Sequence, residues 1–412
     1  MLFGAATAAY QIEGAWDEAG KGRSIWDDYV RVPGAIENDD TGDVACDHYH
    51  RYREDVALMA DLGLDAYRFS ISWPRVLPEG SGRVEQRGVD FYDRLVDELL
   101  ANGIRPWVTL YHWDLPSALY ARGGWESPEC VEWFAEYANV VAERLGDRVK
   151  DWMTLNEPEV VAFAGYAWGQ HAPGARDPAR AVRVSHGLLN AHAAGLDALR
   201  AAVPDARLGI ALNVSPVEPA TDSEEDAAAA RRVDGQLNRW FLDAVFARGY
   251  PGDMVEWYGW DRPAATPATP DFVGVNYYFR RIVRAADNFL GADQVEVTGV
   301  PTSDMGWEIH PDGLFEILAR VRDEYAPAAI AVTENGIALE GIDDRGRVAY
   351  LGDHIERARK IADAYFVWSL LDNFEWAWGY RMRFGIVHVD FETQQRTVKT
   401  SGRWYAERIR AR

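Results

Sequence analysis

The chain contains 412 residues, enough for two or three ordinary domains or for one large α/β barrel. Its 48% hydrophobic and 26% charged residues are typical of a globular protein and exclude disordered, collagen-like and disulfide-scaffold chains. Lys and Arg total 43 against 65 Asp and Glu, a formal net charge of −22 that disfavours nucleic-acid and membrane-surface partners. A small molecule is the expected partner.

The two cysteines, Cys46 and Cys130, cannot form a disulfide framework and do not lie in zinc-binding spacings. The first residues lack the basic and apolar regions of a secretory signal, and no apolar run is long enough to span a membrane. We therefore expect a cytoplasmic protein. The 17 Trp, 19 Tyr and 15 Phe residues suit sugar recognition, although most of these rings are expected to fill the core.

Short apolar runs closed by Gly, Pro or Asn predict eight strands, each followed by a helix or a long insertion. In chain order these strands cover residues 3–11, 66–72, 105–112, 151–156, 207–213, 271–278, 329–334 and 364–372. Apolar residues spaced three and four apart predict helices at residues 53–62, 91–100, 128–145, 177–203, 223–248, 311–325, 350–362 and 399–409.

This alternation predicts an α/β fold, a single (β/α)8 TIM barrel whose active site lies at the C-terminal ends of the strands. The Pro-rich stretch at residues 261–270 is short enough to connect a helix to a strand inside such a fold. We therefore expect residues 1–412 to form one catalytic domain.

Two glutamates, Glu157 and Glu334, lie at predicted strand ends, which a barrel brings to one mouth. A pair of carboxylates flanking one bond is the minimum apparatus for glycoside hydrolysis. Glu157 has apolar and amide neighbours that disfavour its charge, which suits a general acid. Arg68 would keep Glu334 ionised as a nucleophile if it points into the same mouth. Two unrelated strand-end acids are the alternative interpretation.

Seven motifs occur along nearly the whole chain in the order found in a known enzyme family. They are GAATAAYQIEG (4–14), YRFSISWPR (67–75), TLYHWDLP (109–116), TLNEP (154–158), NYY (276–278), VTENG (332–336) and FVWSLLDNFEW (366–376). With them the chain resembles glycoside hydrolase family 1, the retaining β-glucosidases and β-galactosidases. The resemblance implies Glu157 as acid/base, Glu334 as nucleophile, and hydrolysis of terminal β-D-glucosyl residues, as in cellobiose degradation.

The resemblance also implies roles for other residues at the mouth, without a cofactor or metal. The sugar ring would be hydrogen-bonded, lined or stacked by Gln11, His112, Trp113, Asn156, Trp368, Glu375 and Trp376. Tyr278 and Arg68 would contact the nucleophile. Asn213, Asn276 and Phe384 would support the site.

Some positions depart from the family pattern. The residue after the Asn-Glu-Pro motif is often Trp and forms a platform for the leaving group, but here it is Glu159. Phe279 follows Tyr278 where Thr is more usual, and the loop at residues 284–301 is shorter than in other members. The leaving-group preference is therefore left open. A wider pocket mouth or a lower stability of the fold is the expected consequence of the shorter loop.

Three rival interpretations remain. His48 and His50, or His112 with Asp114, have the spacing of metal ligands, but core hydrogen bonds are the simpler expectation. A sugar-binding barrel without catalysis would have lost one of the two glutamates, and a 6-phosphoglycosidase would meet repulsion from the carboxylates at residues 372–376. Gluco-, galacto- or fuco-preference, transglycosylation and oligomeric state stay undetermined.

Overall fold

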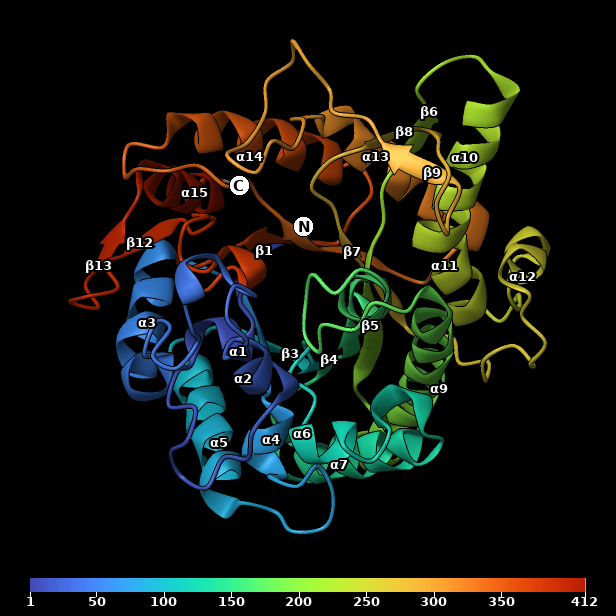
Figure 1. Ribbon diagram of the computed structural model, residues 1–412. Helices are drawn as coiled ribbons and strands as arrows, with labels where there is room; N and C mark the ends of the chain where they lie inside the picture. The colour runs from blue at the N-terminus through green and yellow to red at the C-terminus, as the bar shows by residue number, and fades with distance from the viewer. Residues whose placement is uncertain (412) are drawn as a thin grey trace.

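The computed structural model describes residues 1–411 and shows parallel strands in a closed barrel surrounded by helices (Figure 1). Within these residues the ring contains eight strands. They are β1 (Leu2–Ala6), β2 (Ala66–Ser70), β3 (Arg105–Tyr111), β4 (Asp151–Asn156), β5 (Arg207–Asn213), β7 (Phe272–Asn276), β10 (Ile330–Asn335) and β11 (Ala364–Trp368). β1 pairs with β11, so the two ends of the chain close the ring. The predicted TIM barrel is confirmed, and the assignment of residues 1–412 to one domain stays a prediction.

Long helices cover the outside of the barrel. They are α3 (His48–Leu62), α5 (Gln86–Ala101), α7 (Glu129–Leu145), α9 (Pro178–Ala202), α10 (Glu224–Asp234), α11 (Trp240–Val245), α13 (Pro311–Arg320), α14 (Arg345–Ala358) and α15 (Thr400–Arg410). Local sequence explains their starts. Asp177 caps α9 by accepting from the backbone of Arg180, and Ser223 caps α10 ahead of an acidic first turn. Among residues 1–411, every helix is too short or too polar to cross a membrane.

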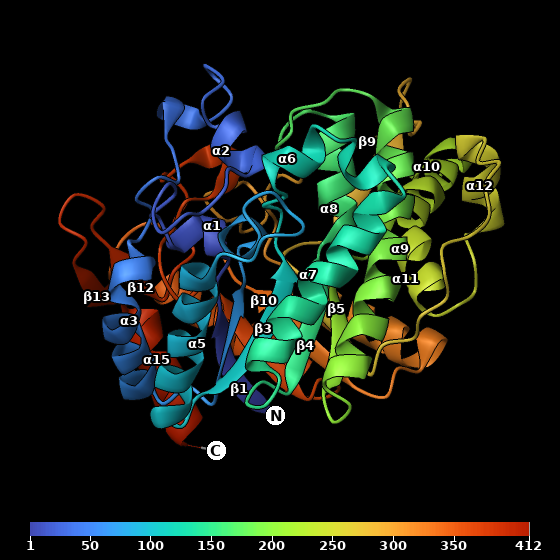
Figure 2. The same ribbon diagram turned by 90° about the horizontal axis from the view of Figure 1, so that it is seen from below.

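Short elements lie between the long ones. The helices are α1 (Ala9–Ile12), α2 (Ile25–Tyr29), α4 (Trp73–Val76), α6 (Ser117–Tyr120), α8 (Pro158–Ala162) and α12 (Gly252–Tyr258). Two small sheets consist of β6 (Val217–Pro219) with β8 (Arg281–Ala285) and β9 (Ala292–Gln294), and of β12 (Val387–Val389) with β13 (Arg396–Val398). Figure 2 shows α2, α6, α8 and β9 on the side of the barrel opposite the N-terminus, the side on which the strands end.

Several predicted elements differ in extent from the observed ones, for example the last barrel strand, which ends at Trp368 and not at residue 372, and two of them show a local cause. The first strand ends at Ala6, and its predicted second half forms helix α1, because the backbone of Ala9 leaves the sheet and donates to the Ser70 hydroxyl. The predicted helix at 223–248 is divided into α10 and α11 by a π-helical turn that begins at Gly235. Gly235 lies against Met254, where a Cβ would approach the sulfur to 2.4 Å, so contact with α12 shapes this turn.

The lower half of the barrel interior is filled by aromatic side chains. The ring of Trp107 contacts those of Phe272 and Phe366, with centroids 5.3 and 4.9 Å away. Two glycines on opposite sides of the ring, one on β1 and one on β5, leave space for these rings. A Cβ at Gly4 would lie 2.6 Å from the Phe366 ring, and one at Gly209 would lie 2.5 Å from the Phe272 ring. This dense floor leaves the polar strand ends above it as the place for a site.

Candidate active site

Four strand ends bring a connected polar network to the mouth of the barrel. Arg68 on β2 donates from Nη1 to Oε1 of Glu334 on β10 at 2.6 Å, and from Nη2 to Oδ1 of Asn156 on β4 at 2.5 Å. Asn276 on β7 donates from Nδ2 to Oε1 of Glu157 at 2.6 Å and to Oδ1 of Asn156 at 3.1 Å. Both glutamates and their three partners are therefore held in one buried hydrogen-bonded cluster.

Glu334 has two partners that favour its charged form. Besides the bond from Arg68, its Oε2 accepts a hydrogen bond of 2.7 Å from the Tyr278 hydroxyl. Burial raises the pKa of Glu334 above its ordinary value, and the Arg68 cation and the Tyr278 hydrogen bond oppose that rise. Phe384 packs edge-on against Tyr278, with ring centroids 6.0 Å apart, and so fixes the donor.

Glu157 is held in a different environment. It directly precedes helix α8 with φ of 49° and ψ of 63°, a left-handed conformation that is uncommon for a residue with a side chain. Burial raises the pKa of Glu157 well above its ordinary value, and the neighbouring charges of Glu334 and Glu159 raise it further. Only the amide of Asn276 and the more distant Arg68 act in the opposite direction. The surroundings of Glu157 therefore favour its protonated form more strongly than those of Glu334 do.

Two of the predicted sugar-contacting residues, Gln11 and Glu375, lie together beside this cluster. Gln11 donates from Nε2 to Oδ1 of Asn373, to the carbonyl of Phe374 and, at 3.4 Å, to Oε2 of Glu375. Burial raises the pKa of Glu375 to about 8, and the charge of Glu334 acts in the same direction. Helix α1 and the loop after β11 thus form one wall.

Aromatic rings adjoin these residues, since Trp376 directly follows Glu375 in the loop after β11. The rings of His112 and Trp368 are stacked with centroids 5.9 Å apart, and Trp376 lies 4.5 Å from Trp113. Burial lowers the pKa of His112 well below its ordinary value, so its Nε2 accepts a hydrogen bond of 3.1 Å from the Asn156 amide. This neutral ring is anchored to the same asparagine that contacts Arg68.

Asn213 lies at the end of β5 opposite Asn276 in the strand register. It therefore borders the cluster, and its assignment as a supporting residue stays a prediction. Thr333 has a supporting contact that the sequence reasoning missed: its hydroxyl donates to Oδ1 of Asn276 at 2.7 Å and so orients the amide toward Glu157. The motif contains this threonine, but only the strand register shows which neighbour it faces.

The histidines considered as metal ligands are separated. His48 is buried against Asp55, whereas His50 is bonded to Asp47 and Glu18 at the surface. Within the part of the chain that the structure describes, one group of possible ligands has its ligand atoms within 4.8 Å of one another, namely Glu218, His310 and Glu316. Arg280 already donates to both carboxylate oxygens of Glu218.

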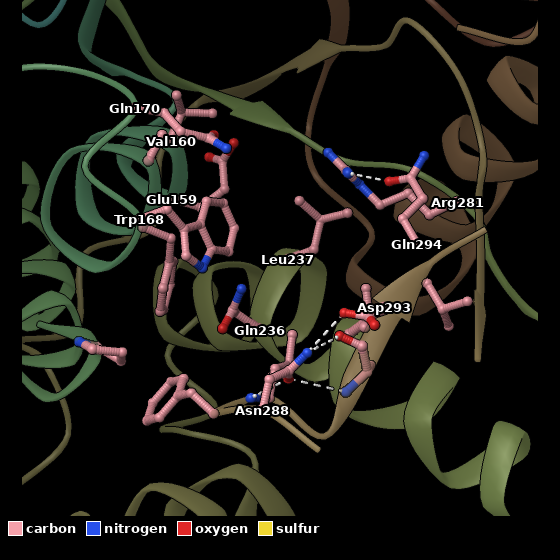
Figure 3. A pocket seen from close by; sticks show the side chains of 18 residues that line it. Glu159, Val160, Trp168, Gln170, Gln236, Leu237, Arg281, Asn288, Asp293 and Gln294 are labelled. Atoms are coloured by element: carbon pink, nitrogen blue, oxygen red, sulfur yellow. Dashed lines mark hydrogen bonds between the residues drawn. The ribbon is translucent and has the colours of Figure 1, made fainter. Parts of the chain in front are cut away.

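A hollow of about 570 Å³ lies beside helix α8 (Figure 3). Glu159 on α8 is one of its lining residues and lies two positions after Glu157 in the chain. Burial raises the pKa of Glu159 to about 8. Sequence reasoning expected Glu159 on the leaving-group side, but it missed Trp168 and Arg281 on the same walls, because neither belongs to a motif.

Comparison with known proteins agrees with this geometry. The model of glycosyl hydrolase family 1 matches residues 1–412. Similar relatives include β-glucosidase A of Thermotoga maritima, 47% identical over 432 residues, and 1,4-β-D-glucan glucohydrolase of Thermotoga neapolitana, 46% identical over 433 residues. Each alignment covers 100% of this chain and 97% of the relative.

Solved structures show the same likeness. The family 1 β-glucosidase of Thermotoga maritima has a TM-score of 0.94 and 46% identity, covering 99% of this chain and 97% of that one. The complex of that enzyme with glucoimidazole also has a TM-score of 0.94, with 47% identity and the same coverage. A TIM barrel with two buried glutamates at its mouth defines a class of glycoside hydrolase. The chain belongs to glycosyl hydrolase family 1.

Proposed function

We propose that this protein is a retaining β-glucosidase that releases terminal, non-reducing β-D-glucosyl residues from small glycosides and oligosaccharides such as cellobiose. One observation carries the proposal. The two buried carboxylates have opposite environments, because Glu334 is bonded to a cation and a hydroxyl whereas Glu157 receives one amide and faces other acids. Such a division between two carboxylates assigns one as nucleophile and the other as acid.

In the first step the carboxylate of Glu334 attacks the anomeric carbon, and the bond to the leaving-group oxygen breaks. Glu157 transfers its proton to that oxygen, so the leaving group departs as a neutral alcohol. The glucosyl residue is then joined to Glu334 by an ester bond. In the second step Glu157, now ionised, takes a proton from water as the water oxygen attacks the anomeric carbon from the face that the leaving group left, and the ester bond breaks to release glucose and the Glu334 carboxylate. Two inversions give net retention.

The roles of the other residues at the mouth are those that the family resemblance implies. Hydrogen bonds to the sugar hydroxyls come from Gln11, His112, Asn156, Glu375 and Trp376, Trp113 lines the pocket, and Trp368 stacks beneath the ring. Arg68 and Tyr278 keep the nucleophile ionised and oriented. The preference for glucose is supported by the names of the relatives and by the glucoimidazole complex of the Thermotoga maritima enzyme. A reducing, cytoplasmic location is supported by two free, buried cysteines, Cys46 and Cys130.

The test is hydrolysis of 4-nitrophenyl β-D-glucoside followed by proton NMR. We expect β-glucose as the first product, before mutarotation mixes the anomers, and a higher kcat/KM for the glucoside than for the matching galactoside and fucoside. A Glu334→Gln sample purified in parallel controls for contaminating hydrolases. Initial release of α-glucose would overturn the retaining mechanism, and a preference for another sugar would overturn the glucose assignment.

A further inference from the structure

Among residues 1–411, Glu159 is a buried acid to which no other side chain donates a hydrogen bond. Its side chain extends from the first turn of helix α8 and is only 4% exposed. In the described part of the chain, neither of its carboxylate oxygens has a hydrogen-bond partner. An unpaired buried carboxyl group costs free energy, and native proteins retain such a group where a ligand completes it.

Arg281 lies across the same hollow with a donor left over. It begins strand β8, and its Nη1 donates to Oε1 of Gln294 at 2.9 Å. Its guanidinium lies 4.9 Å from the centre of the Phe279 ring, and among residues 1–411 its buried Nε has no partner. Figure 3 shows Glu159 and Arg281 on opposite sides of the hollow, with Leu237 between them. An unused acceptor thus faces an unused donor.

Trp168 supplies a flat surface beside Glu159. It lines the hollow, is 49% exposed, and lies next to Glu159 in Figure 3. Half-exposed indole faces are suited to contacts with the C–H face of a sugar ring. The hollow also has amide side chains, Gln170 and Gln236, among apolar residues. Its walls therefore combine a stacking surface with separated polar groups.

We propose that Glu159 and Arg281 together bind the hydroxyls of one leaving-group sugar stacked on Trp168, and so select glycosyl over aryl and alkyl leaving groups. This inference rests on the proposed function, because the hollow receives a leaving group only if Glu157 acts as the acid. A sugar hydroxyl both donates and accepts, so one ring can complete an acid on one side and a guanidinium on the other. An aryl or alkyl ring satisfies neither group and leaves both buried and unpaired.

A charged leaving group fits less well. An amine would be repelled by Arg281, and above the Glu159 pKa of about 8 a phosphate or carboxylate would be repelled by Glu159. The two residues together present one acid and one cation. A neutral, polyhydroxylated ring is the chemistry that matches both walls.

The test compares three substrates in Glu159→Leu, Arg281→Met and the double variant. Cellobiose has a sugar leaving group, cyclohexyl β-D-glucoside has an unactivated ring without hydroxyls, and 4-nitrophenyl β-D-glucoside needs little protonation. We expect the ratio of kcat/KM for cellobiose to that for the cyclohexyl glucoside to fall about tenfold or more in each single variant, since each removes a hydrogen bond to a charged or acidic group. In the double variant the ratio should fall by less than the product of the two single-variant fold-decreases, because both residues hold one ring.

The cyclohexyl glucoside separates binding from acid catalysis. If Glu159 acted only through the acid Glu157, kcat/KM would fall equally for cellobiose and for the cyclohexyl glucoside. The ratio of the two kcat/KM values would then stay constant, which would overturn the proposal. A ratio within twofold of wild type in both single variants would do the same. Glu159→Gln keeps a donor and an acceptor and should retain most of the selectivity. Arg284→Met, an exposed arginine on the same strand, is the matched control and should leave the ratio unchanged.

Binding provides a readout that does not need turnover. Calorimetric titration of cellobiose into Glu334→Gln, with and without Glu159→Leu or Arg281→Met, should show at least tenfold weaker binding in the combined variants. A wild-type protein that hydrolysed no β-glucoside would refute the proposed function. The titration would then decide separately whether the two residues hold a sugar, and unchanged binding would overturn the inference.

Discussion

Arg68 and Glu334, 266 positions apart in the chain, are joined by a buried hydrogen bond of 2.6 Å across the mouth of the barrel. The guanidinium belongs to β2 and the carboxylate to β10, and both side chains are almost fully excluded from water. A buried ion pair of this kind favours the charged form of the acid and fixes its orientation. The nucleophile of the proposed reaction therefore depends on a strand from the other half of the sequence.

The first prediction concerns Arg68→Met, which removes the cation next to Glu334. Loss of this cation should raise the pKa of Glu334, so the acidic limb of the pH profile of kcat/KM should move to higher pH. At neutral pH we expect kcat/KM to fall about a hundredfold or more, because the nucleophile is less ionised and less well held. Arg68→Lys keeps the charge, so the acidic limb of its profile should lie closer to the wild-type position than that of Arg68→Met. An acidic limb at the same pH in both variants would contradict this role.

The second prediction separates the two glutamates by leaving-group acidity. Glu334→Gly should abolish turnover of ordinary glucosides, and azide with an activated glucoside should give the α-glucosyl azide. Glu157→Ala should still form the glucosyl-enzyme from 2,4-dinitrophenyl β-D-glucoside, because that leaving group needs no proton, and azide should then give the β-glucosyl azide. NMR of the products distinguishes the anomers. Azides of one configuration from both variants would show that the roles are misassigned.

The third prediction concerns Glu159→Trp, which introduces a ring and removes an acid. Stacking should improve kcat/KM for aryl glucosides relative to cellobiose by several-fold, corresponding to about 1 kcal/mol. Glu159 has a pKa of about 8, so its charge opposes ionisation of Glu157 on the alkaline side. Without that charge, the pKa of Glu157 falls and the alkaline limb should move to lower pH. The pH profile of kcat/KM provides the measurement, and an unchanged limb would mean that the two acids do not interact.

The fourth prediction concerns stability. Gly209→Ala places a Cβ where only 2.5 Å separates it from the Phe272 ring in the packed barrel floor, so it should destabilise the fold by about 1–3 kcal/mol. Gly252→Ala at the start of α12 meets no atom within 4 Å and is the matched control. Thermal unfolding followed by circular dichroism should show a lower midpoint for the first variant and little change for the second. Equal midpoints would mean that the floor can relax.

Residue patterns alone were enough to predict the barrel and to place the two glutamates at strand ends. Each strand is a short apolar run closed by a polar residue, so the period of the pattern predicts its position, and the position places Glu157 and Glu334 at strand ends. The family motifs added the order of these ends along the chain. Strand limits were less certain, as residues 9–12 show, because a hydrogen bond from Ala9 to Ser70 ends the first strand early.

The side-chain contacts of the site could be identified only from the folded arrangement of the strands and loops. Arg68 reaches Glu334, and Thr333 orients Asn276, because closure of the ring fixes the register of neighbouring strands. Arg281 on β8 and Glu159 on α8 line the same hollow although they are far apart in the chain. Such contacts depend on the path of long loops between elements far apart in sequence, and no local periodicity encodes that path.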